Sequence, residues 1–151
     1  MLLPYETIFS RVRGRIDDPK ELSYEESDLI DIYTERLNNV VGNPRVRRLF
    51  SSLSLDDEIQ QMNFILNNPV DDTSDKNFVI GILVLGMEIE WLEPQVNSLK
   101  STAEALSGKE EKMLLSPHKN NMTKLDDMKR ELNKRIRDYG YMYNSYINSE
   151  S

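Results

Sequence analysis

The amino-acid sequence predicts an all-α protein, a small helical bundle around a central apolar helix at about residues 76–92, with a long C-terminal amphipathic helix. Three observations predict this class: apolar residues recur at helical spacing, glycine and proline separate the periodic segments, and one segment is apolar on every face. A length of 151 residues suits a single core. We therefore expect a helical domain over residues 1–140 and a short tail over residues 141–151.

Two amphipathic helices are predicted in the first 41 residues. The first ends before Pro19, because the residue that precedes a proline is driven out of the helical region. Ser23 and Glu26 have the spacing of a capping box and open the second helix, which ends at Gly42. Steps of three and four residues define the two apolar stripes: Tyr5, Ile8, Phe9, Val12 and Ile16 in the first, and Leu29, Ile30, Tyr33, Leu37, Val40 and Val41 in the second.

The segment from Pro44 to Leu66 is less regular. Pro44 suits the first position of a short third helix through Phe50, and the serines of residues 51–54 interrupt the apolar pattern. Residues 58–66 fit either a helix or one short strand. We favour the strand, because the segment is short and its apolar residues alternate: Met62, Phe64 and Leu66.

The stretch from Phe78 to Leu92 is apolar at nearly every position, which is typical of a helix surrounded by partners. Gly81 and Gly86 each cost about 1 kcal/mol relative to alanine in a helix, so we expect a neighbouring backbone to pack closely there. Pro94 is expected to kink or end this helix.

After Pro94, residues 97–120 are polar and predict a long loop with a short helix at about 101–106. The final amphipathic helix follows. Its apolar stripe consists of Met122, Leu125, Met128, Leu132, Ile136, Tyr139 and Tyr143.

The formal net charge is −7, and it is unevenly distributed. Residues 51–100 contain 2 Lys+Arg and 9 Asp+Glu, so this third alone has a net charge of −7. This pattern has two interpretations: acidic helix caps and loops, or one acidic functional surface. The overall charge disfavours non-specific binding to nucleic acid or to an anionic membrane.

The search for chemistry finds no catalytic motif, and we expect no enzyme, no cofactor and no metal site. The chain has no cysteine and no phosphate-binding glycine loop. We interpret His118 as a surface residue in a polar loop. The aspartates near residues 56 and 72 lack the spacing of a calcium-binding loop and are interpreted as caps. The N-terminus has no signal-peptide pattern, and the apolar stretch from Asn77 to Met87 is too short to span a bilayer.

Two segments are candidate partner-binding sites. Arg45, Arg47 and Arg48 form a basic turn, for which a solvated turn, a site for an acidic protein and a nucleic-acid contact are all open interpretations. The C-terminal segment carries Tyr141, Met142, Tyr143 and Tyr146 beside Gly140. Tyrosine is favoured at protein interfaces, so a docking tail is the preferred interpretation, with core packing or fraying as the alternative.

The region from Asp75 to Tyr146 resembles the head–tail adaptor (connector or head-completion) proteins of tailed bacteriophages. The resemblance covers about half of the chain. It consists of an apolar helix, a turn of the form Trp91-Leu92-Glu93-Pro94-Gln95-Val96, a polar loop over residues 109–117 and a basic final helix.

This resemblance implies a structural virion protein, made in the host cytoplasm, that forms a ring below the capsid portal. The implied partners are copies of itself, the portal and the next neck or tail-completion protein, while DNA passes through the ring without specific binding and no membrane is involved. The C-terminal segment would dock on the portal. The alternatives are an acidic regulatory protein that mimics DNA, and an enzyme with an unrecognised site.

Overall fold

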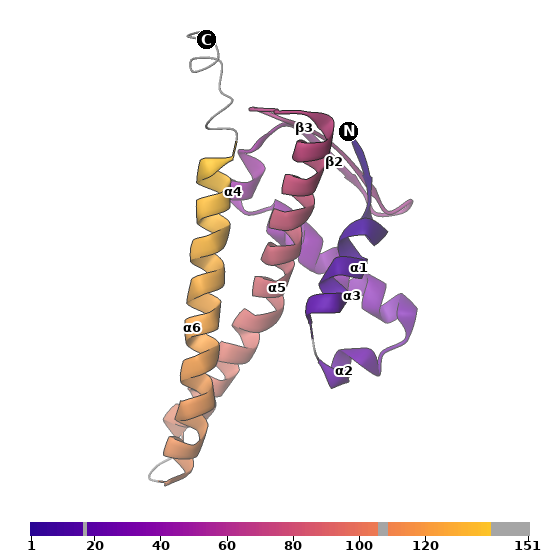
Figure 1. The fold of residues 1–151 in the computed structure, drawn as a ribbon. Helices are drawn as coiled ribbons and strands as arrows, with labels where there is room; N and C mark the ends of the chain where they lie inside the picture. The colour runs from indigo at the N-terminus through magenta and orange to yellow at the C-terminus, as the bar shows by residue number, and fades with distance from the viewer. Residues whose placement is uncertain (17, 106–108, 140–151) are drawn as a thin grey trace.

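The computed structural model describes residues 1–16, 18–105 and 109–139. Over these residues the protein is mostly helical, with six helices and one antiparallel sheet of three strands (Figure 1). The predicted helical character is confirmed. The all-α class is wrong, because residues at the N-terminus and residues 50–66 form the sheet.

The sheet consists of β1 (Leu2–Pro4), β2 (Phe50–Asp56) and β3 (Gln61–Leu66), in the order β1-β3-β2. The predicted strand at 58–66 is confirmed as β3, whose alternate residues Met62, Phe64 and Leu66 are buried. The serines before it do not break the structure. They lie in β2, where pairing with β3 satisfies the backbone although the sequence of β2 is mostly polar.

Four short or medium helices contribute to the core: α1 (Tyr5–Arg15), α2 (Pro19–Leu22), α3 (Glu26–Val41) and α4 (Pro44–Arg47). The predicted stripes of α1 and α3 are largely buried. Two predicted helix boundaries are wrong. Ser23 closes α2 rather than capping α3, and α4 ends before Phe50, because Phe50 begins β2.

The longest helix, α5 (Asp72–Ala105), packs against α1, α3 and α6 and is buried at every residue from Ile82 to Ile89. It does not stop at Pro94, and the predicted turn that contains Trp91 and Pro94 is therefore helical. A proline inside a helix costs about 3 kcal/mol. Packing of α5 against α6 on both sides of Pro94 offsets this cost, because tertiary contacts supply most of the stability of a helix.

Helix α6 (Lys109–Asp138) lies beside α5, and the two form a long hairpin that extends past α1 and α3 (Figure 1). The predicted loop over 97–120 is wrong, since most of these residues belong to α5 and α6. The predicted stripe of α6 is buried at Leu125, Met128 and Leu132, whereas Met122 is 40% exposed. Polar residues are compatible with both helices because one face of each meets solvent.

Gly86 marks the closest approach of α5 to α3. A Cβ atom at Gly86 would lie 2.5 Å from Cγ1 of Val40. A close approach at this glycine is confirmed, but the predicted neighbouring backbone is wrong, because the nearest atoms belong to the side chain of Val40. At Gly81 the nearest atom is NH1 of Arg135 at 3.6 Å, an ordinary contact, so the same expectation is wrong there.

Candidate interaction surface

The C-terminal end of α6 is fixed to the first turn of α5 by Asp75. This carboxylate is 6% exposed, accepts a hydrogen bond from the backbone N–H of Val70 at 2.9 Å and accepts a second from the hydroxyl of Tyr139. The ring of Tyr139 also stacks on Phe78, with the centroids 3.7 Å apart. The chain therefore leaves its last described residue beside the start of α5.

The surroundings of Tyr139 favour its neutral form. Burial and the hydrogen bond to Asp75 raise the pKa of the Tyr139 phenol, and the charges of Asp75 and Asp71 add to this effect. The start of α5 is capped by Asp71, whose carboxylate accepts the backbone N–H of Ser74 at 2.7 Å, and this bond lowers the pKa of Asp71. The root of the C-terminal tail is thus a defined structural site.

The basic turn lies on α4 and the residue after it. Arg45, Arg47 and Arg48 are all exposed, and the NH1 group of Arg47 donates to the carbonyl of Phe50 at 3.3 Å. The side chain of Asn43 caps this short helix by accepting the N–H of Arg45 at 3.0 Å. The turn is therefore an ordered, solvent-facing cationic surface.

The basic turn and the root of the tail lie at the same end of the molecule. The backbone N–H of Asn67 donates to the carbonyl of Leu49 at 2.9 Å, and its side-chain amide donates to the carbonyl of Arg48 at 2.6 Å. Three residues further on, Val70 donates to Asp75, which holds Tyr139. Three residues span at most about 11 Å, so the loop after β3 brings the two segments together.

Four of the predicted partner-binding residues fall beyond this root. Tyr141, Met142, Tyr143 and Tyr146 lie outside the described residues. Their neighbour Tyr139, which was predicted as part of the apolar stripe of the last helix, is the residue through which that helix contacts the start of α5.

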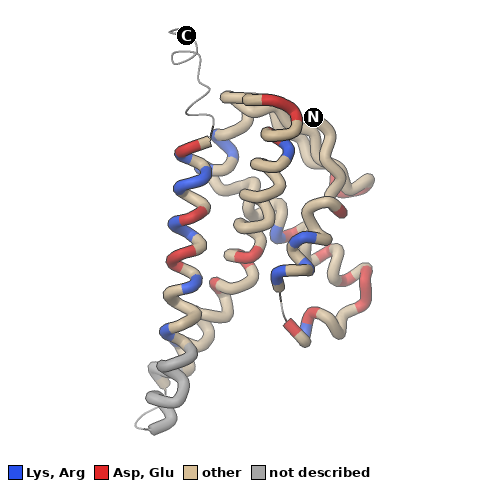
Figure 2. The backbone as a smooth tube through the Cα atoms, viewed as in Figure 1, with Lys and Arg blue, Asp and Glu red and all other residues tan. Residues whose placement is uncertain are grey.

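The acidic residues of the middle third lie in three places rather than on one continuous surface. One group is the turn between β2 and β3, a second is the start of α5, and a third lies halfway along α5. In the third group Glu88 pairs with Arg15 at 3.8 Å, and Glu93 pairs with Lys129 at 2.9 Å. Figure 2 shows the acidic positions distributed in this way, with alternating signs along α6. Caps and ion pairs therefore account for many of these charges.

A buried polar network holds α2 against α3 and α5. Glu21, 7% exposed, pairs with Arg36, whose guanidinium lies 5.8 Å from the ring centroid of Tyr33. The indole N–H of Trp91 donates to Asp18 at 3.0 Å and lowers the pKa of that carboxyl. These contacts explain why a polar segment is well packed, and four of these residues line an open cavity of about 550 Å³ between α2, α3 and α5.

His118 is not the surface-loop residue that the sequence predicts. It lies on α6 and is 4% exposed. Seven and fourteen residues later, Leu125 and Leu132 are also buried, so His118 occupies the same side of the helix. The sequence does not indicate this burial, because residues 97–120 are polar and predict a loop.

Within the described ranges no three His, Asp or Glu side chains are placed to hold a metal ion. No helix in that part of the chain has the length and apolarity needed to cross a membrane. Three of the cavities there are open to solvent and lined by mixed polar and apolar groups.

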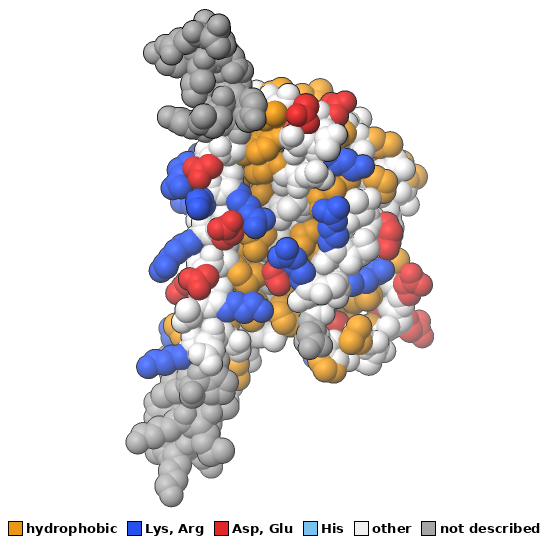
Figure 3. Space-filling model, in the orientation of Figure 1, with side chains coloured by type: hydrophobic (Ala, Val, Ile, Leu, Met, Phe, Trp, Pro, Cys, Tyr) orange, Lys and Arg blue, Asp and Glu red, His pale blue; other side chains and the backbone are white. Residues whose placement is uncertain are grey.

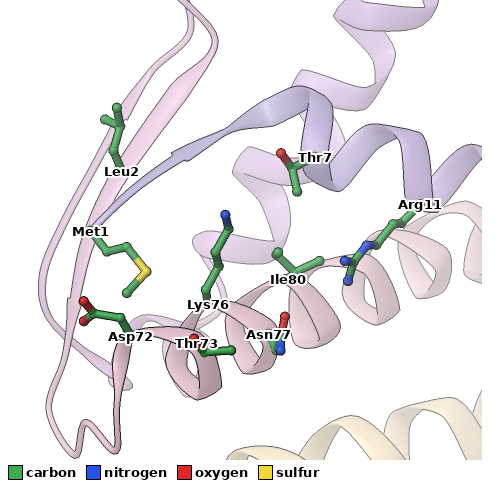
Figure 4. A pocket seen from close by; sticks show the side chains of 9 residues that line it. All are labelled: Met1, Leu2, Thr7, Arg11, Asp72, Thr73, Lys76, Asn77 and Ile80. Carbon is green, nitrogen blue, oxygen red and sulfur yellow. The ribbon is translucent and has the colours of Figure 1, made fainter.

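One such cavity is a cleft of about 480 Å³ between the N-terminal strand, α1 and the start of α5 (Figure 4). Arg11 and Lys76 bring positive charge to it from two different helices. Sequence reasoning missed this pairing because the two residues are far apart along the chain. The sequence indicates only that Arg11 lies off the apolar stripe of α1, which carries no information about Lys76.

Comparison of the chain with protein-family models, curated proteins and solved structures finds no match.

Proposed function

We propose that this protein is a structural adaptor that docks on a larger protein through the end bearing the basic turn and the C-terminal tail. The observation that carries this proposal is the fixed root of the tail. The contacts of Asp75 with Tyr139 and Val70 hold it at the same end as Arg45, Arg47 and Arg48. A cationic turn and a tyrosine-rich segment together suit a partner with acidic and apolar surface.

The specific assignment is a head–tail adaptor of a tailed bacteriophage, found in the virion at the head–tail interface. In this function the protein forms a ring below the portal, and the tail residues Tyr141, Met142, Tyr143 and Tyr146 are the anchors on the portal. Buried aromatic anchors are each worth about 2 kcal/mol or more at an interface. The support for this assignment is the sequence resemblance together with the single docking end.

The acidic DNA-mimic function has less support. A mimic needs negative charge spread over its folded surface in the manner of phosphates. Here acidic residues of α5 are paired with Arg15 and Lys129, and α6 alternates in sign (Figure 2). The charge distribution therefore favours the adaptor.

The test is to image the purified protein mixed with a purified portal ring from a tailed bacteriophage by electron microscopy. We expect the full chain to add density to one end of the portal ring. Deleting residues 141–151 should abolish this density and leave the helical circular dichroism unchanged, because Tyr139 and its contacts remain.

Two variants refine the result. Replacing Tyr141, Tyr143 and Tyr146 with serine keeps the length of the tail and should also abolish docking. Replacing Lys100 with glutamate, at the other end of α5, changes the net charge but should leave docking intact. Docking of the truncated protein at full occupancy would overturn the proposal, and unfolding of the truncated protein would show that the tail is part of the core.

A further inference from the structure

The cleft between β1, α1 and α5 is a basic surface flanked by apolar side chains. Met1 and Leu2 supply apolar surface, Ile80 lies beneath it and is 1% exposed, and Thr7, Thr73 and Asn77 add neutral polar groups. In Figure 4, Lys76 extends from α5 towards β1, and Arg11 reaches from α1 towards Ile80 and Asn77. Such a surface suits a ligand that presents an acidic and an apolar side chain together.

The two cations of the cleft outnumber its acidic residues. Within the described residues neither Arg11 nor Lys76 takes part in an ion pair, and Asp72 is the single acidic residue in the lining. Figure 3 shows the molecule from the side seen in Figure 1, where basic side chains lie on both sides of a strip of hydrophobic ones, with acidic side chains among them. The cleft therefore has positive potential in a protein whose net charge is −7.

A complementary surface lies elsewhere on the same chain, at the turn between β2 and β3. This turn, residues 56–60, carries three consecutive acidic residues followed by Ile59, which is 63% exposed. Large exposed apolar side chains are few in the described part of the chain; Ile59 of the turn and Leu2 of the cleft, 57% exposed, are two of them.

The acidic turn is held in one shape. Asp56 accepts the backbone N–H groups of Glu58 at 3.1 Å and Ile59 at 3.3 Å, and Asp57 accepts the hydroxyl of Tyr5 at 2.6 Å. Asp56 and Asp57 are thus occupied within the molecule, and the exposed side chains of Glu58 and Ile59 form the tip. A preorganised tip loses less conformational entropy when it binds.

We propose that the acidic turn of one copy of this chain binds in the basic cleft of the next copy. The carboxylate of Glu58 faces Arg11 and Lys76, and Ile59 packs against the apolar surface of Met1 and Leu2. Because the turn and the cleft are different surfaces, each bound pair still has one open cleft and one open turn. Such a heterologous contact repeats, and it closes into a ring when the rotation between copies allows. The inference rests on the proposed ring function and supplies its subunit contact.

Disulfide trapping tests this contact directly, since the natural chain has no cysteine. Full chains carrying Glu58→Cys are mixed with tagged full chains carrying Thr73→Cys, which lines the cleft, and are oxidised mildly. We expect mixed disulfide dimers to form at least tenfold faster than in the control mixture. In the control, Thr102→Cys replaces Thr73→Cys, because Thr102 is exposed on the same helix about 44 Å away along its axis.

The double variant Glu58→Cys/Thr73→Cys should form a ladder of dimers, trimers and larger species, whereas each single variant should stop at dimers. Equal rates of disulfide formation for Thr73→Cys and Thr102→Cys would overturn the contact. A double variant that forms dimers and no larger species would also overturn it.

Charge reversal provides a second, independent measurement that does not depend on oxidation. Glu58→Lys and Lys76→Glu should each weaken self-association by about tenfold or more in sedimentation equilibrium, and combining them in one chain should restore it. Lys100→Glu is the control, because it changes the net charge by the same amount as Lys76→Glu. A chain that stays monomeric at millimolar concentration, or a double variant without rescue, would overturn the proposal.

These measurements separate the two proposals. Loss of the contact between turn and cleft with retained docking on the portal would overturn the subunit contact alone. Retained cross-linking by a protein that does not dock would overturn the portal assignment and leave the contact between copies intact.

Discussion

At the scale of single residues, Tyr139 shows how one side chain fixes the end of a long helical hairpin. Its hydroxyl donates to the buried Asp75 and its ring stacks on Phe78. Tyr5 has a similar arrangement, because its hydroxyl donates to Asp57 in the turn between β2 and β3. In both cases a phenol bonded to a carboxylate ties together segments that are more than 50 residues apart.

These two tyrosines predict a loss of stability at high pH. Burial and the neighbouring carboxylates raise the pKa of both phenols above the ordinary value of 10.0. Above about pH 10 the unfolded chain therefore releases protons that the folded chain retains, and the free energy of unfolding falls as pH rises. We expect Tyr139→Phe to make this fall shallower between pH 9 and 11.5, measured by urea unfolding. Tyr24→Phe, an exposed position, should leave it unchanged, and identical pH profiles for all three proteins would contradict the assignment.

At the scale of elements, the contact between α3 and α5 depends on the missing side chain of Gly86. Val40 of α3 occupies the space that a Cβ atom at this position would need, whereas Gly81, five residues earlier on α5, has only ordinary contacts. The two glycines lie on the same helix and have the same intrinsic helix propensity. Any difference between them therefore comes from their surroundings.

Substitution by alanine should therefore have opposite effects at these two positions. Gly81→Ala should raise the free energy of unfolding by about 0.5–1 kcal/mol, because alanine restricts the unfolded backbone and favours the helix. Gly86→Ala should lower it by about 1–3 kcal/mol, because the methyl group overpacks the interface. Chemical denaturation measures both changes.

A second substitution identifies the cause. Val40→Ala removes the clashing atoms, so the effect of Gly86→Ala should be smaller in that background, a coupling that a double-mutant cycle detects. Additive effects of the two substitutions would show that Val40 is not the obstacle.

At the scale of the whole molecule, basic and acidic side chains occupy different places, which the net charge alone does not show. The basic turn and the basic cleft are cationic sites on a chain of net charge −7, while much of the acidic middle third is engaged in caps and ion pairs. This distribution provides local attraction for acidic protein surfaces, and the overall charge still repels a polyanion.

We therefore expect duplex DNA to bind more weakly than about 10⁻⁴ M at physiological salt, the weak end of non-specific affinity. Fluorescence anisotropy of a labelled duplex measures this, with the triple variant Arg45→Glu, Arg47→Glu, Arg48→Glu as the matched comparison. Tighter binding that weakens with added salt and disappears in the triple variant would instead assign the basic turn to nucleic acid.

The sequence by itself determined the features that depend on local periodicity. The stripes of α1 and α3 and the apolar middle of α5 repeat at helical spacing, and the alternation of Met62, Phe64 and Leu66 specified β3. Side-chain direction follows from backbone periodicity within a single element, so these residues need no information from the rest of the chain.

The tertiary structure alone decided what depends on partners far along the chain. Strand β2 forms from a serine-rich segment because β3 pairs with it, and α5 continues through Pro94 because α6 packs beside it. The cleft unites Arg11 and Lys76, and the docking end unites Arg48 and Tyr139 through the loop after β3. Each of these features depends on contacts between different elements, whose energy is absent from the periodicity of any one segment.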